Sequence, residues 1–205
     1  CGCVPQSTDN AIIDTGHIIT LSTNHTIRNI TVRWDGELAN GNKSFYVDGN
    51  YTIHGTHSGT GRVFLQGVNT NIDGIGTITF SSTTRYYITT SNKTILSSAN
   101  LSLTAANLSI QDNVQITNKG TFTVYNDILD VTGGETWVND TNAVLNMGGE
   151  FFEQSGTGML SASAPGNTMN YNGNVAQNIK TPISSYYHLR VDSSNTKTLT
   201  GNVDI

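Results

Sequence analysis

Short alternations of apolar and polar residues recur in the stretch between residues 101 and 131, where Asn, Asp, Gly and small residues separate them. Alternation with a period of two indicates a strand with one buried face, and the separating residues form turns. The segments follow one another too closely for a β-sandwich, in which turns come about every 8–12 residues. A stack of coils explains them better, because each short strand then pairs with its copy in the next coil. The alternating segments are Leu101–Leu103, Leu108–Ile110, Val114–Ile116, Phe122–Val124 and Leu129–Val131.

The same pattern continues on both sides of this stretch, with a strand, a turn and a second strand about every twenty residues, as in solenoid repeats. Glu and Ala are sparse, and no window shows a period of 3.6 residues, so little or no helix is expected. We therefore predict an all-β chain folded as a right-handed parallel β-helix (β-solenoid) of about ten coils and roughly 50 Å in length. Residues 1–205 are predicted to be a single segment of a longer protein, with a loop or joint at 161–170, where Pro165 and Gly166 form a turn pair.

Charged residues make up 12% of the chain, and the formal net charge is −5. The Lys and Arg residues are scattered singly, which argues against nucleic-acid binding, and no apolar run is long enough for membrane insertion. Asn is abundant, and we expect stacked Asn side chains to satisfy each other's amide groups from coil to coil. Cys1 and Cys3 leave their pairing open. Cys1 is either a lipid-bearing mature N-terminus or the place where a fragment begins, and a bridge between the two cysteines would close a strained ring.

The acidic and histidine pairs do not have the surroundings of a catalytic or metal site. Asp127 and Asp130 lack a nearby basic partner, so we interpret them as turn and strand-flank residues. Glu150 and Glu153 flank two phenylalanines after a Gly-Gly turn, and we interpret them as part of a solvated turn. The remaining pair, His54 and His57, has the spacing of two metal ligands, but no third ligand is close in sequence. We interpret both histidines as surface residues, and we predict no catalytic site, no metal and no cofactor.

Aromatic pairs are the best candidates for contacts with a ligand. Tyr86 and Tyr87 are adjacent, as are Tyr186 and Tyr187, so in a strand one ring of each pair points inward and the other outward. The outward ring could serve as a platform for carbohydrate or for another partner. Three T-x-T segments, which begin at Thr77, Thr121 and Thr198, leave open an ice- or surface-binding solenoid, although ordinary outward threonines fit them equally well.

Two blocks at opposite ends of the chain resemble a known group of repeat proteins. Residues 4–21 read VPQSTDNAIIDTGHIITL, and residues 171–202 contain YNGNVAQNI, YYHLRV and KTLTGN. These motifs are similar to coils of the secreted β-solenoid repeat proteins, adhesin-like surface proteins among them, that gliding and related bacteria export by type IX secretion. The resemblance implies an extracellular or cell-surface location, a strand with a tryptophan before Cys1, and a C-terminal sorting domain beyond Ile205.

From these observations we predict that the chain is a non-enzymatic secreted or cell-surface β-solenoid with a structural or adhesive role. It would form a segment of a long adhesin or surface fibre. Its expected partners are neighbouring coils or subunits of the same surface protein, with a carbohydrate or an abiotic surface as a further candidate. A carbohydrate-active enzyme (a polysaccharide lyase or a glycosidase) on the same scaffold is the competing hypothesis. Neither end of the sequence offers a recognisable cap, so the terminal coils are expected to expose strand edges and apolar side chains.

Overall fold

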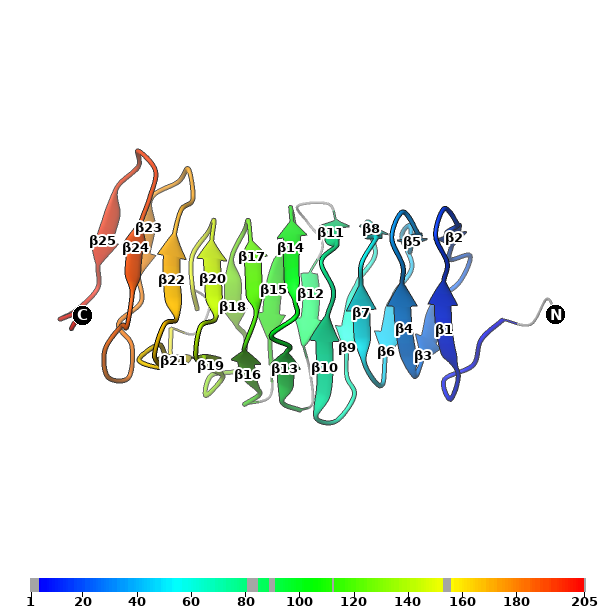
Figure 1. Cartoon of the computed structure of the whole chain (residues 1–205), viewed down its shortest axis with the longest axis horizontal. Helices are drawn as coiled ribbons and strands as arrows, with labels where there is room; N and C mark the ends of the chain where they lie inside the picture. Colours follow the sequence, from blue (N-terminus) through cyan, green and yellow to red (C-terminus); the bar gives the residue numbers. More distant parts are fainter. Residues whose placement is uncertain (1–3, 81–84, 89–90, 112, 153–155, 205) are drawn as a thin grey trace.

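The computed structural model describes residues 4–80, 85–88, 91–111, 113–152 and 156–204, and for residues 85–87 it describes the backbone alone. In these ranges the chain forms strands, turns and bends, and the strands stack into one elongated body (Figure 1). The described part contains no helix that is long and apolar enough to cross a membrane. The prediction of an all-β parallel solenoid is confirmed.

The strands form three long parallel sheets and one short one, which we name sheets I to IV. Sheet I contains β1 (Asn10–Ile13), β4 (Asn29–Val32), β7 (Tyr51–Ile53), β10 (Thr70–Asp73), β13 (Lys93–Ile95), β16 (Gln115–Asn118), β19 (Thr136–Asn139) and β21 (Met159–Ser161).

Sheet II lies beside sheet I and holds the next strand of every coil. Its members, in order along the body, are β2 (Ile18–Thr20), β5 (Glu37–Ala39), β8 (Thr56–Gly59), β11 (Thr77–Phe80), β14 (Asn100–Thr104), β17 (Thr121–Val124), β20 (Val144–Met147), β22 (Thr168–Tyr171) and β24 (Leu189–Val191).

Sheet III closes the coil on its third side, and sheet IV completes the last coils. Sheet III contains β3 (His25–Ile27), β6 (Phe45–Val47), β9 (Val63–Leu65), β12 (Arg85–Ile88), β15 (Asn107–Ile110) and β18 (Ile128–Asp130). Sheet IV contains β23 (Gln177–Ile179) and β25 (Lys197–Leu199).

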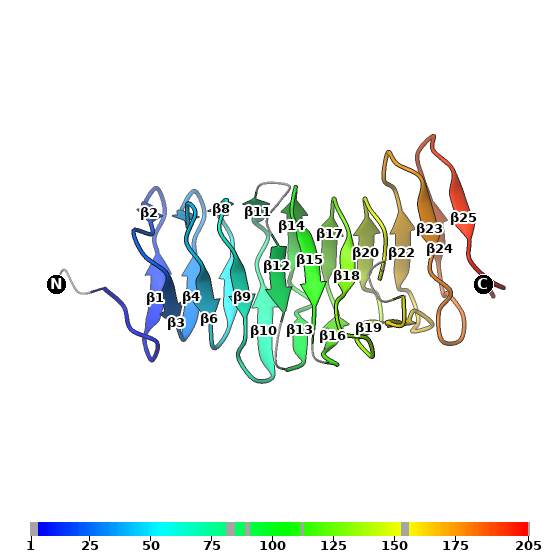
Figure 2. The ribbon, with the colours of Figure 1, turned by 180° about the vertical axis from the view of Figure 1, so that it is seen from behind.

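Each regular coil contributes one strand to each of sheets I, II and III, so β1–β3 form coil 1, β4–β6 form coil 2 and β7–β9 form coil 3. Sheet I rises on the near face of Figure 1 and sheet III descends on the opposite face (Figure 2), which makes the coil right-handed. Phe45 pairs with Val63, whereas Thr77 pairs with Ser102, so coil length varies between 18 and 25 residues. The stack has about eight coils rather than the ten predicted. The prediction assumed two strands in about twenty residues, whereas a regular coil holds three strands, joined by corners of unequal length.

The interior consists of columns in which one inward side chain per coil lies on its neighbour. The central inward column of sheet II is the clearest case: Thr77 and Thr79 of β11 are exposed, while Ile78 between them is 1% exposed. This alternation is what a half-buried strand requires. We call this set of residues the sheet II column. It runs through Ile19, Leu38, His57, Ile78, Leu103, Val124, Met147, Tyr171 and Val191.

Asparagines also stack from coil to coil, as the sequence predicts. In the interior, the Asn118 side-chain amide donates to the Asn139 side-chain oxygen at 2.8 Å and to the Val144 carbonyl at 3.1 Å. On the surface, the Asn29 side-chain oxygen accepts from the backbone N–H of Asn50 at 2.6 Å. Because amides buried without partners are costly, these ladders let polar residues occupy positions in a column.

The segment 161–170, expected to be a loop or joint, runs from the end of β21 through a turn into β22. Both strands continue long sheets, since β21 pairs with β19 and β22 pairs with β20. Cys1 and Cys3 lie outside the described residues.

Candidate functional site

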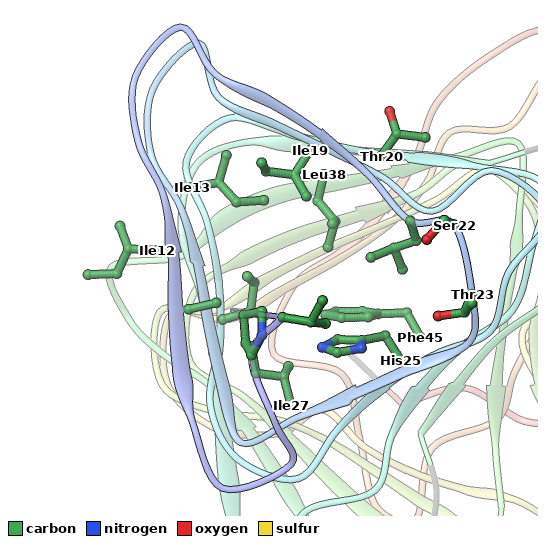
Figure 3. Close-up of a pocket in the computed structure, with 15 residues that line it drawn as sticks. Ile12, Ile13, Ile19, Thr20, Ser22, Thr23, His25, Ile27, Leu38 and Phe45 are labelled. Carbon is green, nitrogen blue, oxygen red and sulfur yellow. The ribbon is translucent and has the colours of Figure 1, made fainter. Parts of the chain in front are cut away.

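The N-terminal end of the solenoid holds an open, mainly apolar cavity with a volume of about 460 Å³. Figure 3 shows that Ile13, Ile19 and Leu38 point into the coil, whereas Ile12 points away from it. His25 and Phe45 lie side by side at the floor of the cavity (Figure 3), and the His25 Nε2 atom has no hydrogen-bond partner among the described residues. The lining residues are Val4, Pro5, Ala11–Ile13, Ile19–Thr23, His25, Ile27, Ile30, Leu38 and Phe45.

This cavity exists because the inward side chains of coil 1 have a neighbour on one side only. Ile19 is 48% exposed, whereas Leu38, the next member of the sheet II column, is 2% exposed. Strands β1, β2 and β3 are each the outermost strand of their sheet in the described structure. Their outer edges therefore present backbone N–H and C=O groups in the arrangement that a further parallel strand would pair with.

The C-terminal end shows the same change in burial. Tyr171 is 0% exposed and its neighbour Val191 is 48% exposed, and Ile179 is 3% exposed where Leu199 is 56% exposed. Both end coils therefore leave apolar side chains partly in water.

The acidic pairs serve as hydrogen-bond acceptors for the backbone of neighbouring coils. Asp127 Oδ1 accepts from the Glu150 N–H at 2.8 Å, and both Glu150 carboxylate oxygens accept from the Asn178 N–H, at 2.9 and 3.0 Å. Asp130 is fully buried, and its Oδ2 accepts from the Gly158 N–H at 2.9 Å. Glu153 lies outside the described residues. The three described carboxylates thus have a structural use, as side chains that cap or join coils.

A smaller cavity of about 260 Å³ lies near the C-terminal end, between Glu150, Phe152 and Lys180. The Lys180 ammonium donates to the Gly156 carbonyl at 2.9 Å and lies 5.8 Å from the centre of the Phe152 ring. Burial lowers the pKa of Lys180, and the negative charge of Asp130 opposes that shift. The cation is thus held by a carbonyl and an aromatic face.

The two histidines predicted to lie at the surface behave differently from each other. His57 is 0% exposed, because the alternation in Thr56–Gly59 turns it inward, and the prediction for this residue is wrong. Its Nδ1 lies 2.6 Å from the Tyr51 hydroxyl, and burial lowers its pKa to about 3. His54 lies at the corner between sheets I and II. The described residues include no group of three or more His, Cys, Asp or Glu side chains placed to hold a metal ion.

The tyrosine pair at the C-terminal end has one inward and one outward ring, as predicted. Tyr186 is 2% exposed, and its hydroxyl donates to the Lys180 carbonyl. Burial raises the pKa of Tyr186, and it raises that of the neighbouring Tyr171 to about 12. Tyr187 is 44% exposed and stands edge-on to the His188 ring at 4.6 Å between ring centres. For Tyr86 and Tyr87 only the backbone in β12 is described, and their side chains lie outside the described part.

Two of the three T-x-T segments share a sheet. The first lies in β11 and the second in β17, both in sheet II, where Thr77 pairs with Ser102 and Ser102 with Thr123. The third lies in β25 of sheet IV, away from this row.

Sequence reasoning missed the exposed aromatic residues Trp34 and Tyr125, each of which is 57% exposed. Trp34 directly precedes the turn pair Asp35-Gly36, and Tyr125 directly precedes Asn126-Asp127. A large aromatic residue beside turn formers, outside the strand alternation, was the available indication that these rings lie in the corners.

No family model matches this sequence, and neither the curated proteins nor the solved structures yield a significant match.

Proposed function

We propose that this chain is a non-enzymatic structural segment of an extracellular or cell-surface β-solenoid protein, with a structural or adhesive role. The observation that carries the proposal is the exposure of apolar side chains and strand edges in the two end coils. Ile19 and Val191 occupy the column that is otherwise buried, yet each is 48% exposed. A surface fibre needs a body that extends by coils, and each end of this chain offers strand edges and apolar side chains for that extension.

The occupant that fits the N-terminal end is another parallel coil of the same surface protein. Such a coil would pair with β1, β2 and β3 and would place an apolar side chain over Ile19, His25 and Leu21. A compact globular partner could bury the side chains, but it would leave the strand-edge N–H and C=O groups without partners. The resemblance to proteins exported by type IX secretion supports the extracellular location.

Sedimentation and thermal unfolding of residues 1–205, compared with a longer version of the natural chain, test the proposal. We expect the short chain to self-associate with rising concentration and to unfold at a lower temperature, because water contacts its end coils. A strictly monomeric short chain with the same unfolding temperature would contradict the proposal that further coils pack on its ends. Protease treatment of intact source cells tests the location, since a surface protein is cleaved without lysis.

The competing proposal, a carbohydrate-active enzyme, has its own test. The structure uses Asp127, Asp130 and Glu150 as acceptors for backbone amides. We therefore expect no cleavage of neutral or acidic polysaccharides. Turnover that disappears in Asp127→Ala, with folding unchanged, would replace the structural proposal by the enzymatic one.

A further inference from the structure

The corner between sheets I and II changes its length along the first three coils. In coils 1 and 2 it is a four-residue turn: the His17 N–H donates to the Asp14 carbonyl at 3.1 Å, and the Gly36 N–H donates to the Arg33 carbonyl at 3.0 Å. In coil 3 only His54 and Gly55 separate β7 from β8. Trp34 is the second residue of the coil 2 turn, so its side chain lies beside the shorter corner of coil 3.

The Trp34 ring contacts a ring of the next coil, although 57% of the residue is exposed. It stacks on His54, with 6.1 Å between ring centres and 23° between ring planes. Beneath it the backbone of the two coils is closely packed, because a Cβ atom on Gly55 would lie 2.2 Å from the Gly36 carbonyl oxygen. An exposed aromatic ring with little freedom to lose makes binding less costly.

Polar groups with fixed positions flank the ring. On the coil 1 side, Arg33 Nη1 donates to Asp14 Oδ1 at 3.1 Å, and the two side chains remain 50% and 61% exposed. The Thr15 N–H and then Arg33 lower the pKa of Asp14, so its carboxylate is charged at neutral pH. On the coil 3 side, the His54 Nδ1 atom is buried and has no hydrogen-bond partner among the described residues.

We propose that this surface, the Trp34 corner (Asp14, Arg33, Trp34 and His54), binds a neutral polysaccharide chain. The C–H face of a sugar ring would pack on the open part of the indole. Hydroxyl groups of the sugar would donate to Asp14 and accept from Arg33, because a hydroxyl can both donate and accept hydrogen bonds. The inference goes beyond the structural role and does not depend on the end contacts.

Charge favours a neutral chain over an anionic one. Arg33 is already paired with Asp14, Asp35 follows Trp34 in the same turn, and the whole chain carries a formal charge of −5. A polymer of uronic acids would meet this negative field, and repulsion between like charges weakens binding. A protein partner is the other occupant that an exposed tryptophan suggests. It is less favoured, because the corner consists of turns of only four and two residues, whereas stable protein interfaces cover broad surfaces.

Tryptophan fluorescence provides a specific test, because the chain has only two tryptophans, Trp34 and Trp137, and Trp137 is 0% exposed. Quenching by iodide therefore reports on Trp34. The probes are hexasaccharides of β-linked glucose, mannose and N-acetylglucosamine, with polygalacturonate as the anionic probe. We expect at least one neutral probe to protect Trp34 from iodide, and Trp34→Ala to weaken its binding about tenfold or more in calorimetry, the loss expected of an aromatic anchor.

Tyr125→Ala is the matched control, because Tyr125 is equally exposed at a different corner, and its affinity should equal that of the wild type. Asp14→Asn supplies a second variant, which should weaken binding without changing the unfolding temperature. Protection by none of the neutral probes would overturn the proposal. So would binding that survives in Trp34→Ala and Asp14→Asn, or binding of polygalacturonate alone.

Discussion

Ile19 and Val191 stand at the two ends of a single column of side chains, and each is 48% exposed, although every residue between them in that column is buried. Leu38 and Val124 are aliphatic like the two end residues and are almost fully buried, so the difference comes from the number of neighbouring coils. Among the described residues, Ile19 and Val191 each have a neighbouring coil on one side only. A further coil packed on either end would therefore bury the side chain of Ile19 or Val191.

Ile19→Asp should reduce self-association of the chain and leave its unfolding temperature almost unchanged, because the new carboxylate remains in contact with water at the open end. Ile18→Asp is the matched control on the same strand, since Ile18 points outward and is 64% exposed. We expect Ile18→Asp to self-associate more than Ile19→Asp when both are measured by sedimentation velocity. Equal behaviour of the two variants would show that association does not use the open end.

Acid should destabilise the fold through His57. Its pKa is lowered to about 3 in the folded state and lies near 6.5 in the unfolded chain, so between these values the unfolded chain binds the extra proton. Stability therefore falls as the pH drops from 6.5 to 3, by a total on the order of 4 kcal/mol for the full shift. Urea unfolding at several pH values should show this slope in the wild type. His57→Phe should flatten it, whereas replacing the exposed His17 by Ala should not.

Asn118 and Asn139 should be energetically coupled. Their amides share a hydrogen bond of 2.8 Å inside the solenoid, and Asn139 also donates to the Ala143 and Thr168 carbonyls. Asn139→Leu leaves the Asn118 amide and these carbonyls with fewer partners, a loss of about 1–3 kcal/mol for each buried group without a partner. A double-mutant cycle with Asn118→Leu should give a coupling energy of about 0.5 kcal/mol or more. If the losses in unfolding free energy of the two single variants simply add in the double variant, the two asparagines do not stabilise the fold jointly.

Lys93 should contribute strongly to stability even though it forms no ion pair among the described residues. It is 2% exposed, and its ammonium donates to the Gly67 carbonyl at 2.5 Å and to the Ser91 carbonyl at 2.8 Å. Lys93→Ala leaves a cavity and deprives these carbonyls of a donor, so we expect a loss of about 2 kcal/mol or more in urea unfolding. Lys119, whose contact with Asp140 is exposed, is the comparison, and Lys119→Ala should cost less than about 1 kcal/mol. Similar losses in the two variants would argue against a stabilising role of the hydrogen bonds from Lys93 to the two carbonyls.

Gly55→Ala should destabilise the chain more than Gly16→Ala, although both glycines lie in the corner between sheets I and II, Gly16 in coil 1 and Gly55 in coil 3. A Cβ atom on Gly55 meets the Gly36 carbonyl oxygen at 2.2 Å and the Arg33 carbonyl oxygen at 2.4 Å, whereas one on Gly16 meets nothing within 4 Å. Gly16→Ala then carries only the strain of its positive φ of 73°, about 1–2 kcal/mol. Thermal unfolding of the two variants tests the order, and equal losses would show that the coils can separate at this corner.

Period-two alternation was sufficient to predict the strands and the stacking, because a solenoid repeats the same inward and outward choice in every coil. Leu101–Leu103 and Phe122–Val124 lie in strands that pair directly, as the pattern required. The number of coils could not be obtained in this way. Corner length is set by turns such as His54-Gly55, which has two residues where the same corner of coils 1 and 2 has four. Hydrophobic patterns carry no information on such turns.

The site was less predictable than the fold. The inward position of His57 was readable from its polar neighbours Thr56 and Ser58, yet residue type argued for the surface, and its partner Tyr51 comes from another strand. The cavity at the N-terminal end depends on which coil lacks a neighbour, and this is known only when all the coils have been placed in the stack. The Trp34 corner depends on the unequal lengths of two successive turns, which become comparable only when the register between coils is known.

The hydrogen bonds between coils run along the long axis of the body, because all the long sheets are parallel and stack in that direction. A pull on the two ends would therefore load these bonds in series and open the stack one coil at a time, starting where the junction is weakest. Shear across the body would load all strands of a coil together. Extension of such a body under axial load should therefore proceed coil by coil, in steps of about twenty residues, as in other linear repeat arrays.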